Sequence, residues 1–336
     1  FFGINEQRNG GNMQEYPLHE RDIAEALTHN MKVAGLTYER FFREYDLLSV
    51  YASGQFLNRD SYYGAGKSLS DYGNTKDNSY NIGVQYKAVF GKSTLIGGVE
   101  NTGGFLLDKK LGYPDLENAE INFSDSTINY PHTENTIIAD QSSMTTGFFA
   151  QYELKINKLK VVAGARFDSY EIKDLSDEGC KPKTGEVVSP RLSLMYEVAK
   201  PLQARLSYSQ GYRAPQIFDE DLHIETSGSR KVIHQNSDCL KQETSHSFMA
   251  SLDFNRLIGT VYTGFLAEGF YTKLVDAFAN EFGVPDENGT VIYTRVNADG
   301  GAVVQGINME LKLKPLKDFS LTSGFTLQTS KFEKPQ

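Results

Sequence analysis

The chain has 336 residues, and 34 lysines and arginines against 43 aspartates and glutamates give it a net charge of −9. This balance excludes a nucleic-acid-binding protein, which needs a basic face to neutralise phosphates. Aromatic residues make up 12% of the chain, which argues against intrinsic disorder. No apolar run approaches the roughly 18 residues of a membrane-spanning helix, so a helical membrane protein is excluded, whereas a membrane β-barrel is not.

The first 30 residues show no clear alternation of apolar and polar side chains. We expect residues 1–30 to form a long outer loop that follows the end of an earlier strand at Phe1 and Phe2, with a short helix over residues 20–29. The chain opens with Phe-Phe-Gly, without an initiator methionine or a signal peptide, so we expect it to be part of a longer protein.

From residue 31 onward, apolar and polar side chains alternate with the period of two that indicates β-strands. Between residues 159 and 168, for example, Leu159, Val161 and Phe167 lie on one face, and Arg166 and Asp168 lie on the other. The pattern predicts twelve strands, over residues 31–43, 46–60, 79–90, 93–107, 145–156, 159–172, 187–198, 201–215, 240–255, 258–278, 291–314 and 318–332. Several exceed ten residues, a length that suits a tilted crossing of a bilayer.

The predicted connections are alternately short and long. Short turns are predicted at residues 43–46, 90–93, 156–159, 198–201, 255–258 and 314–318. Long polar loops are predicted near residues 61–78, 108–144, 173–186, 216–239 and 279–290. Outer-membrane barrels have this asymmetry, with short periplasmic turns and long extracellular loops.

The two faces of the strands support the same interpretation. One face is apolar, with tyrosine and phenylalanine near the strand ends, and the other is rich in serine, glutamine, arginine, asparagine and glycine. A soluble β-sandwich is the alternative, but it gives no reason for sorting loop lengths by side. The sequence therefore predicts an all-β fold, an antiparallel transmembrane β-barrel of which about twelve strands are present.

Common catalytic and nucleotide-binding motifs are missing. Gly66-Lys67-Ser68 and Gly91-Lys92-Ser93-Thr94 resemble the end of a phosphate-binding loop, but the earlier glycine that the motif requires is replaced by Ser61 and Tyr86. The six histidines are scattered, with no metal-ligand spacing, and no Gly-x-Ser-x-Gly elbow occurs. The sequence offers no evident position for hydrolase chemistry.

The long loops contain two further candidate sites. Cys180 and Cys239 lie in consecutive long loops on the same side, so either a disulfide or two unpaired thiols fit the spacing. The loops are acidic, and clustered carboxylates bind hard cations, so a Ca²⁺ site is a candidate. The alternative is a solvated acidic surface, since the run lacks the alternating ligands of a dedicated calcium loop. The clustered carboxylates are Asp219, Glu220 and Asp221.

Three motifs follow one another between residues 189 and 245. They are Ser189-Pro190-Arg191, then Gly211-Tyr212-Arg213-Ala214-Pro215, then Leu240-Lys241-Gln242-Glu243-Thr244-Ser245. This succession resembles the barrel of TonB-dependent outer-membrane receptors. The resemblance is supported by Gly164-Ala165-Arg166-Phe167-Asp168 before these motifs and Gly306-Ile307-Asn308-Met309-Glu310 after them. The match covers at least residues 145–332, and the siderophore and vitamin B12 branch of the family is the most similar.

The resemblance implies a location in the bacterial outer membrane and a barrel of about 22 strands whose lumen is plugged by an N-terminal domain. Residues 1–336 would then be a partial barrel domain, without the plug, the periplasmic energy-coupling segment or the C-terminal strands. With two unpaired strand edges, the predicted strands alone could not close such a barrel.

The resemblance also implies uptake rather than catalysis. A scarce nutrient such as a ferric siderophore or a corrinoid would bind between the outer loops and the plug, and the TonB protein would relay the energy for its transport. Membrane lipid would surround the barrel. The candidate ligand-binding residues are inward side chains near the mouth, with two rings for stacking, namely Arg166, Asp168, Tyr170, Arg205, Ser209, Tyr212, Arg213, Phe218, Asn308 and Gln328.

Other functions remain open at this stage. A passive porin or adhesin barrel would share the alternation, and a secreted carbohydrate-binding β-protein would share the aromatic content. An enzyme barrel of the phospholipase or protease kind would need a Ser/His or Asp/His pair at the rim, and none is evident. The acidic loops favour a calcium-assisted corrinoid or a cationic ligand over a strongly anionic ferric siderophore.

Overall fold

A computed structural model shows an almost entirely β-stranded chain. It describes all residues except 1, 11–17, 70, 123–126, 130, 134, 176–181, 216–230, 238, 286–289 and 335–336. Thirteen strands form one antiparallel sheet in the order β1-β2-β3-β4-β5-β8-β9-β10-β11-β13-β14-β17-β18. They are β1 (Phe2–Gly10), β2 (Ile23–Phe42), β3 (Asp46–Ala65), β4 (Tyr72–Phe90), β5 (Ser93–Lys110), β8 (Thr136–Ile156), β9 (Leu159–Asp174), β10 (Lys183–Ala199), β11 (Leu202–Arg213), β13 (Glu243–Ile258), β14 (Val261–Val275), β17 (Ala302–Leu316) and β18 (Phe319–Phe332).

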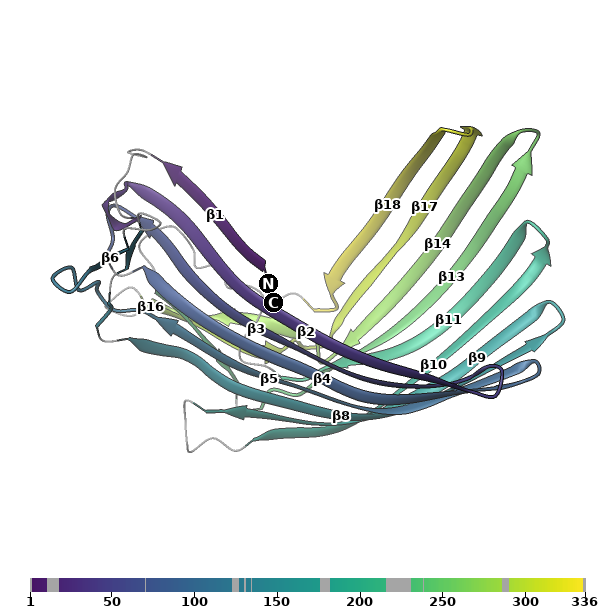
Figure 1. Ribbon diagram of the computed structural model, residues 1–336, viewed down its shortest axis with the longest axis horizontal. Helices are drawn as coiled ribbons and strands as arrows, with labels where there is room; N and C mark the ends of the chain where they lie inside the picture. Colours follow the sequence, from purple (N-terminus) through teal and green to yellow (C-terminus); the bar gives the residue numbers. More distant parts are fainter. Residues whose placement is uncertain are drawn as a thin grey trace.

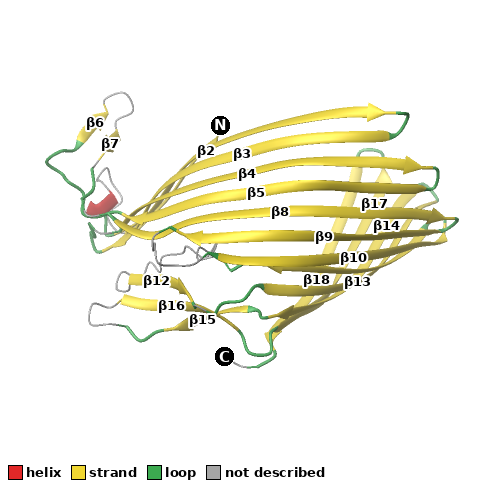
Figure 2. Cartoon of the chain, turned by 90° about the horizontal axis from the view of Figure 1, so that it is seen from below, coloured by secondary structure: helices red, strands yellow, loops and turns green. Residues whose placement is uncertain are grey.

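The sheet curves into an open trough, with β1 and β18 along its two edges (Figure 1). The remaining strands form two small sheets, which lie at the end of the trough opposite the short turns (Figure 2). These strands are β6 (Glu120–Asn122), β7 (Thr127–Asn129), β12 (Lys231–Asn236), β15 (Phe278–Phe282) and β16 (Thr290–Asn297). In the part of the chain that the structure describes, no helix has the length and apolar character needed to cross a membrane.

The predicted antiparallel strand architecture is confirmed, as are five of the six predicted short turns. The turn predicted at residues 255–258 is wrong, because β13 continues to Ile258 and the chain reverses at Gly259 and Thr260. Gly259 has a φ of +60°, a conformation that glycine adopts without a steric penalty. The tight reversal is therefore fixed at the glycine rather than at the polar residues before it.

The prediction for residues 1–30 is wrong. This segment contains β1 and the first part of β2, and the only helix among its described residues is a 3₁₀ turn over Leu18–Glu20. Pairing with β3 explains the difference, because Ile23 to Phe42 forms an unbroken ladder with Asp46 to Ala65. The tertiary partner therefore outweighs the weak local alternation of this segment.

The strand predicted over residues 291–314 is in fact two strands in different sheets. β16 ends at Asn297 and β17 begins at Ala302, and Gly300 and Gly301 between them have φ values of +82° and +79°. Several predicted loops are also shorter than expected, because β3 extends to Ala65 and β4 begins at Tyr72.

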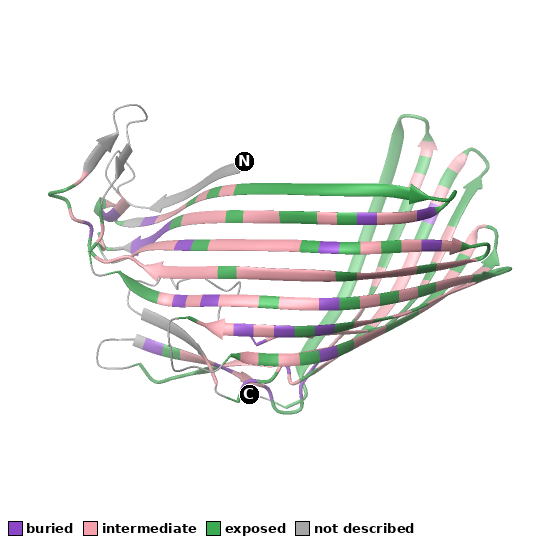
Figure 3. Ribbon diagram, turned by 60° about the horizontal axis from the view of Figure 1, so that its bottom comes forward, coloured by how far each residue is buried: buried purple, intermediate pink, exposed green. Residues whose placement is uncertain are grey.

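The two faces of the main sheet differ in how their side chains meet. Phe148, Leu206 and Phe325 lie on the apolar face and are between 51% and 58% exposed. On the polar face, side chains bond across an intervening strand, as Arg166 of β9 does to Glu100 of β5. Side chains converge on the inside of a curved sheet, so the polar face is the concave one. Along the central strands of the sheet, more buried and more exposed residues follow one another in Figure 3, whereas β18 is exposed along its whole length.

A cluster of rings joins the loops at the end opposite the short turns. His19 is 2% exposed, and its Nδ1 lies 2.8 Å from the hydroxyl of Tyr72. The Tyr72 ring also contacts Tyr62 and His132, at centroid distances of 4.6 Å and 4.8 Å. His132 Nδ1 forms a hydrogen bond of 2.8 Å with the carbonyl oxygen of Gly112. This ring cluster thus connects the 3₁₀ turn, β3, β4 and the loop after β5.

The ring cluster is expected to loosen in mild acid. Burial lowers the pKa of His19 below its usual 6.5; Glu20 raises the pKa and His132 lowers it. The folded state therefore favours neutral His19, and its stabilising effect is present above the unfolded pKa and lost as the pH falls through the lower folded pKa. The protection of residues 18–22 against hydrogen exchange, measured relative to the intrinsic rate at each pH, is expected to fall as the pH is lowered from about 7.5 to 5.

The matched variant is His19→Gln, which keeps a polar side chain without a titrating group in this pH range. Its exchange at residues 18–22 is expected to be independent of pH beyond the intrinsic chemistry. Equal pH dependence in the two proteins would contradict the assignment of the effect to His19.

Candidate functional site

The clearest polar group on the concave wall is an arginine that lies between two carboxylates. Arg166 Nε donates to Asp168 Oδ1 at 2.7 Å, and Arg166 Nη1 donates to Glu100 Oε2 at 2.8 Å. The Asp168 side chain is only 4% exposed, and those of Glu100 and Arg166 are 18% and 32% exposed. The two charged hydrogen bonds fix the guanidinium between the two carboxylates.

The register of the sheet explains how these three charges meet. Gly147 of β8 pairs with Glu100 on one side and with Asp168 on the other, so it lies between the two carboxylates. A Cβ atom at Gly147 would collide with the Arg166 guanidinium and the Asp168 carboxylate. The absent side chain therefore provides the space in which Arg166 crosses from β9 to β5.

The network continues toward β3 through Glu100. Its Oε1 accepts hydrogen bonds from Asn81 Nδ2 at 2.9 Å and from the Tyr51 hydroxyl at 3.3 Å. Tyr51, Asn81, Glu100, Arg166 and Asp168 thereby link β3, β4, β5 and β9 on one face. We call these five residues the wall network. Sequence reasoning identified Arg166 and Asp168 but missed the other three, because which strands lie next to each other is not encoded in the local pattern.

Two tyrosines predicted as ligand-binding residues lie together nearer the loops. The rings of Tyr170 and Tyr212 are stacked, with centroids 5.8 Å apart and an interplanar angle of 22°. Tyr170 is 5% exposed, and its hydroxyl donates to Gln242 Oε1 at 3.1 Å. Tyr212 packs against the buried cluster of Tyr170, Ile172 and Val187. The stacked pair therefore joins β9, β10 and β11 to the segment before β13.

Four other predicted residues lie apart from this group, on the strands between β11 and β18. Arg205 and Asn308 belong to one row across the sheet, in which Asn308 Nδ2 donates to Glu268 Oε1 at 3.1 Å. Ser209 pairs with Ser247 in another row, and Gln328 pairs with Gly306. The structure thus divides the predicted residues between two parts of the wall.

Arg213 lies at the mouth, at the end of β11. Its guanidinium carbon is 5.6 Å from the ring centroid of Phe278, and that of Arg295 is 5.8 Å from the same ring. The Phe278 backbone N–H donates to Glu243 Oε2 at 2.9 Å. Arg295 is 6% exposed, so this arrangement fixes the small sheet of β12, β15 and β16 against the main one.

A second arginine contact on the concave wall went unpredicted, because residues 61–78 were expected to form a loop. Arg59 Nη2 donates to Thr75 Oγ1 at 2.8 Å, and the Thr75 hydroxyl donates to Asp108 Oδ1 at 2.5 Å. Arg59 Nε is buried and has no hydrogen-bond partner among the described residues. The register of β3, β4 and β5 brings these residues into one row.

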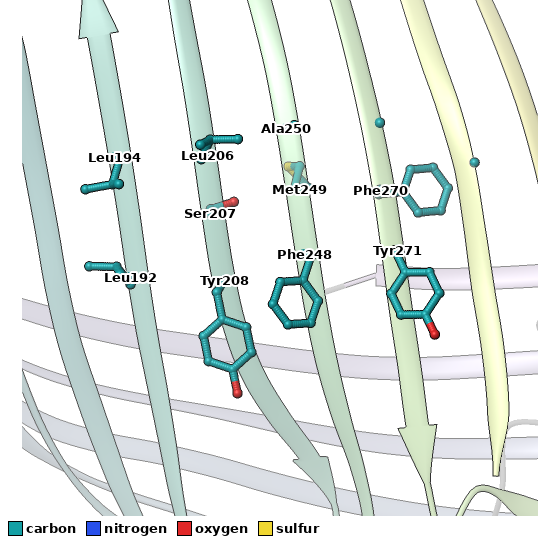
Figure 4. A pocket seen from close by; sticks show the side chains of 12 residues that line it. Leu192, Leu194, Leu206, Ser207, Tyr208, Phe248, Met249, Ala250, Phe270 and Tyr271 are labelled. Carbon is teal, nitrogen blue, oxygen red and sulfur yellow. The ribbon is translucent and has the colours of Figure 1, made fainter. Parts of the chain in front are cut away.

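A surface depression lies largely on the apolar face and not in the lumen. It has a volume of about 580 Å³ and is lined mainly by aliphatic and aromatic side chains of β10, β11, β13 and β14, among them Leu206, Phe248 and Tyr271 (Figure 4). These side chains belong to the face that carries the exposed apolar residues. The depression is therefore a lipid-facing groove between bulky residues.

Several predicted residues lie outside the described part of the chain. They are Phe218, the proposed calcium ligands Asp219, Glu220 and Asp221, and Cys180. Cys239 is exposed. The described residues contain no group of three or more His, Cys, Asp or Glu side chains that could hold a metal ion. The disulfide and the calcium site stay predictions.

The wall network is expected to stabilise the sheet measurably. Arg166→Gln leaves Glu100 and the buried Asp168 without their cation and is expected to lower the free energy of unfolding by about 1–3 kcal/mol. Lys160→Gln is the matched control, because it removes a more exposed ion pair with Glu153, and its cost is expected to stay below about 0.5 kcal/mol. Urea unfolding in lipid vesicles, followed by circular dichroism, measures both, and equal losses would contradict the assignment.

Comparison with solved structures identifies known proteins that share this fold. The chain spans about half the length of the solved structures it matches. The FrpB iron transporter from Neisseria meningitidis matches with a TM-score of 0.64 and 14% identity, over 98% of this chain and 48% of that one. The copper transporter OprC matches with a TM-score of 0.67 and 10% identity, over 92% and 50%. The siderophore receptor PiuA from Acinetobacter baumannii matches with a TM-score of 0.62 and 12% identity, over 94% and 48%.

The family comparison is more direct. No curated protein sequence matches this chain. The model of the TonB dependent receptor-like β-barrel family matches residues 5–335, nearly the whole chain. This agrees with the curved antiparallel sheet, the apolar outer face and the polar concave wall. The chain belongs to the TonB-dependent receptor-like β-barrel family of the outer membrane.

Proposed function

We propose that this chain forms part of the wall of an outer-membrane receptor that takes up a scarce metal chelate with energy relayed by TonB. The observation that carries the proposal is the concave wall, where the wall network and the stacked pair Tyr170 and Tyr212 line one side of the trough. Family membership supports the same conclusion. Ferric siderophores and corrinoids are the two ligand classes considered, and both are metal chelates.

The chemistry of the wall favours a large ligand bound by many weak contacts. Arg166 is already paired with two carboxylates, so the network presents hydrogen-bonding edges rather than an unpaired cation. The half-buried Tyr212 adds ring area close to the mouth, with the buried Tyr170 stacked against it, and aromatic side chains provide large contact areas at a small entropic cost. The iron, copper and siderophore transporters named above support metal-bearing cargo.

An uptake assay tests the proposed function. Cells that make the receptor containing this chain are expected to accumulate a ferric siderophore or a corrinoid only when TonB is present. Uptake of both classes that is unaffected by loss of TonB would contradict the proposal and favour a passive porin. Retained iron with a siderophore mass on the purified receptor would identify one ligand class, and retained cobalt with a corrinoid mass would identify the other.

Tyr212→Ala tests the contribution of the stacked pair. Removing this ring is expected to weaken binding of the transported chelate about tenfold, because buried aromatic side chains often dominate such interfaces. Tyr271→Ala on the apolar face is the matched control, since that ring is 39% exposed and lies outside the concave wall. Equilibrium binding to receptor in detergent micelles gives the comparison, and an equal loss in the two variants would count against a role of the wall.

A further inference from the structure

The short turns share a feature that uptake does not explain. Five of the six turns contain an exposed cation. At the remaining turn, the fifth in chain order, the exposed cation lies three residues before the turn. None of these six side chains forms an ion pair with another residue that the structure describes. They are Arg43, Lys92, Lys158, Lys200, Arg256 and Lys317. We call this set the turn cations.

Exposed apolar side chains accompany the turn cations at every turn. Ile156 precedes Lys158, Val198 precedes Lys200, and these apolar residues are 50% and 45% exposed. The others, which are between 54% and 68% exposed, are Phe41, Tyr45, Phe90, Leu257, Ile258, Leu316 and Phe319. In addition, the Arg40 guanidinium carbon lies 5.0 Å from the ring centroid of Phe42. An apolar band with cations at its rim is the arrangement found where a protein meets lipid headgroups.

The charge at this rim is opposite to that of the chain. Within three residues of the turns, ten lysines and arginines stand against four acids, whereas the chain as a whole has a net charge of −9. The four acids are Glu44, Asp46, Glu197 and Asp318. The acidic residues are concentrated instead toward the long loops at the other end of the strands, as in residues 108–144. The sheet therefore has a basic rim and an acidic rim, separated by its apolar band.

We propose that the turn cations bind the phosphate groups of anionic phospholipid, such as phosphatidylglycerol, in the leaflet at the short turns. The cations follow the whole rim rather than forming one patch, and lipid headgroups surround a barrel in the same way. The exposed apolar neighbours extend into the acyl region beside each headgroup. A folded acidic protein would instead need a compact complementary surface, which a rim spread over six turns does not offer.

The proposal is tested on the whole receptor that contains this chain, in nanodiscs of phosphatidylcholine mixed with phosphatidylglycerol. Native mass spectrometry of the released protein measures how much of each lipid it retains. The test variant changes the five turn cations that lie at the turns themselves and combines Arg43→Gln, Lys92→Gln, Lys158→Gln, Lys200→Gln and Lys317→Gln. The matched control exchanges the same residues for the other cation, as Arg43→Lys, Lys92→Arg, Lys158→Arg, Lys200→Arg and Lys317→Arg.

The unaltered receptor is expected to retain phosphatidylglycerol in preference to phosphatidylcholine. In the glutamine variant, the ratio of retained phosphatidylglycerol to retained phosphatidylcholine is expected to fall at least roughly tenfold. In the control, this ratio is expected to stay the same. Added salt is expected to weaken the preference, as for exposed charges.

Three results would overturn the proposal. The first is that the unaltered receptor shows no preference for phosphatidylglycerol, and the second is that the glutamine variant keeps the preference unchanged. The third is that soluble glycerol phosphate at equal concentration displaces the lipid. Resistance of the folded band to sodium dodecyl sulfate before heating verifies that each variant is folded. If the glutamine variant fails to fold, the three variants Lys92→Gln, Lys158→Gln and Lys317→Gln are made singly, and the proposal fails if none weakens the preference.

Discussion

Continuous antiparallel pairing of the thirteen long strands is the constraint on which the rest of the structure depends. Hydrocarbon offers backbone N–H and C=O groups no partner, so each strand must pair with its neighbours along its whole span. The ladder between β2 and β3 runs without interruption from Ile23 and Ala65 to Phe42 and Asp46. Once this pairing exists, its register decides which side chains meet.

The curvature of the sheet gives the two faces different chemistry. On the concave side, shorter distances across the sheet let Arg166 reach Glu100 over β8, with Gly147 leaving the necessary space. On the convex side, side chains diverge, and aromatic and aliphatic residues are left exposed to the surroundings. The polar wall and the lipid-facing band are therefore two results of one curved sheet whose side chains alternate.

The two ends of the strands differ as clearly as the two faces. At one end, the turns are tight, as at Gly259, and each consists of little more than a cation and its apolar neighbours. At the other end, the connections form small sheets and ring contacts, including Arg213 and Arg295 over Phe278 and the cluster around Tyr72. Only the long connections have enough chain to build such contacts.

Sequence reasoning predicted the strand class, the two faces, most of the turns and the family, because alternation, turn residues and motifs are local. It also placed Arg166, Asp168 and Tyr170 on the polar side of one strand. Only the tertiary pairing extends the strand predicted over residues 31–43 back to Ile23, divides residues 291–314 between two sheets, and brings Tyr51, Asn81 and Glu100 to Arg166. These outcomes depend on which strands are neighbours and in what register, and pairing between distant segments leaves no local pattern.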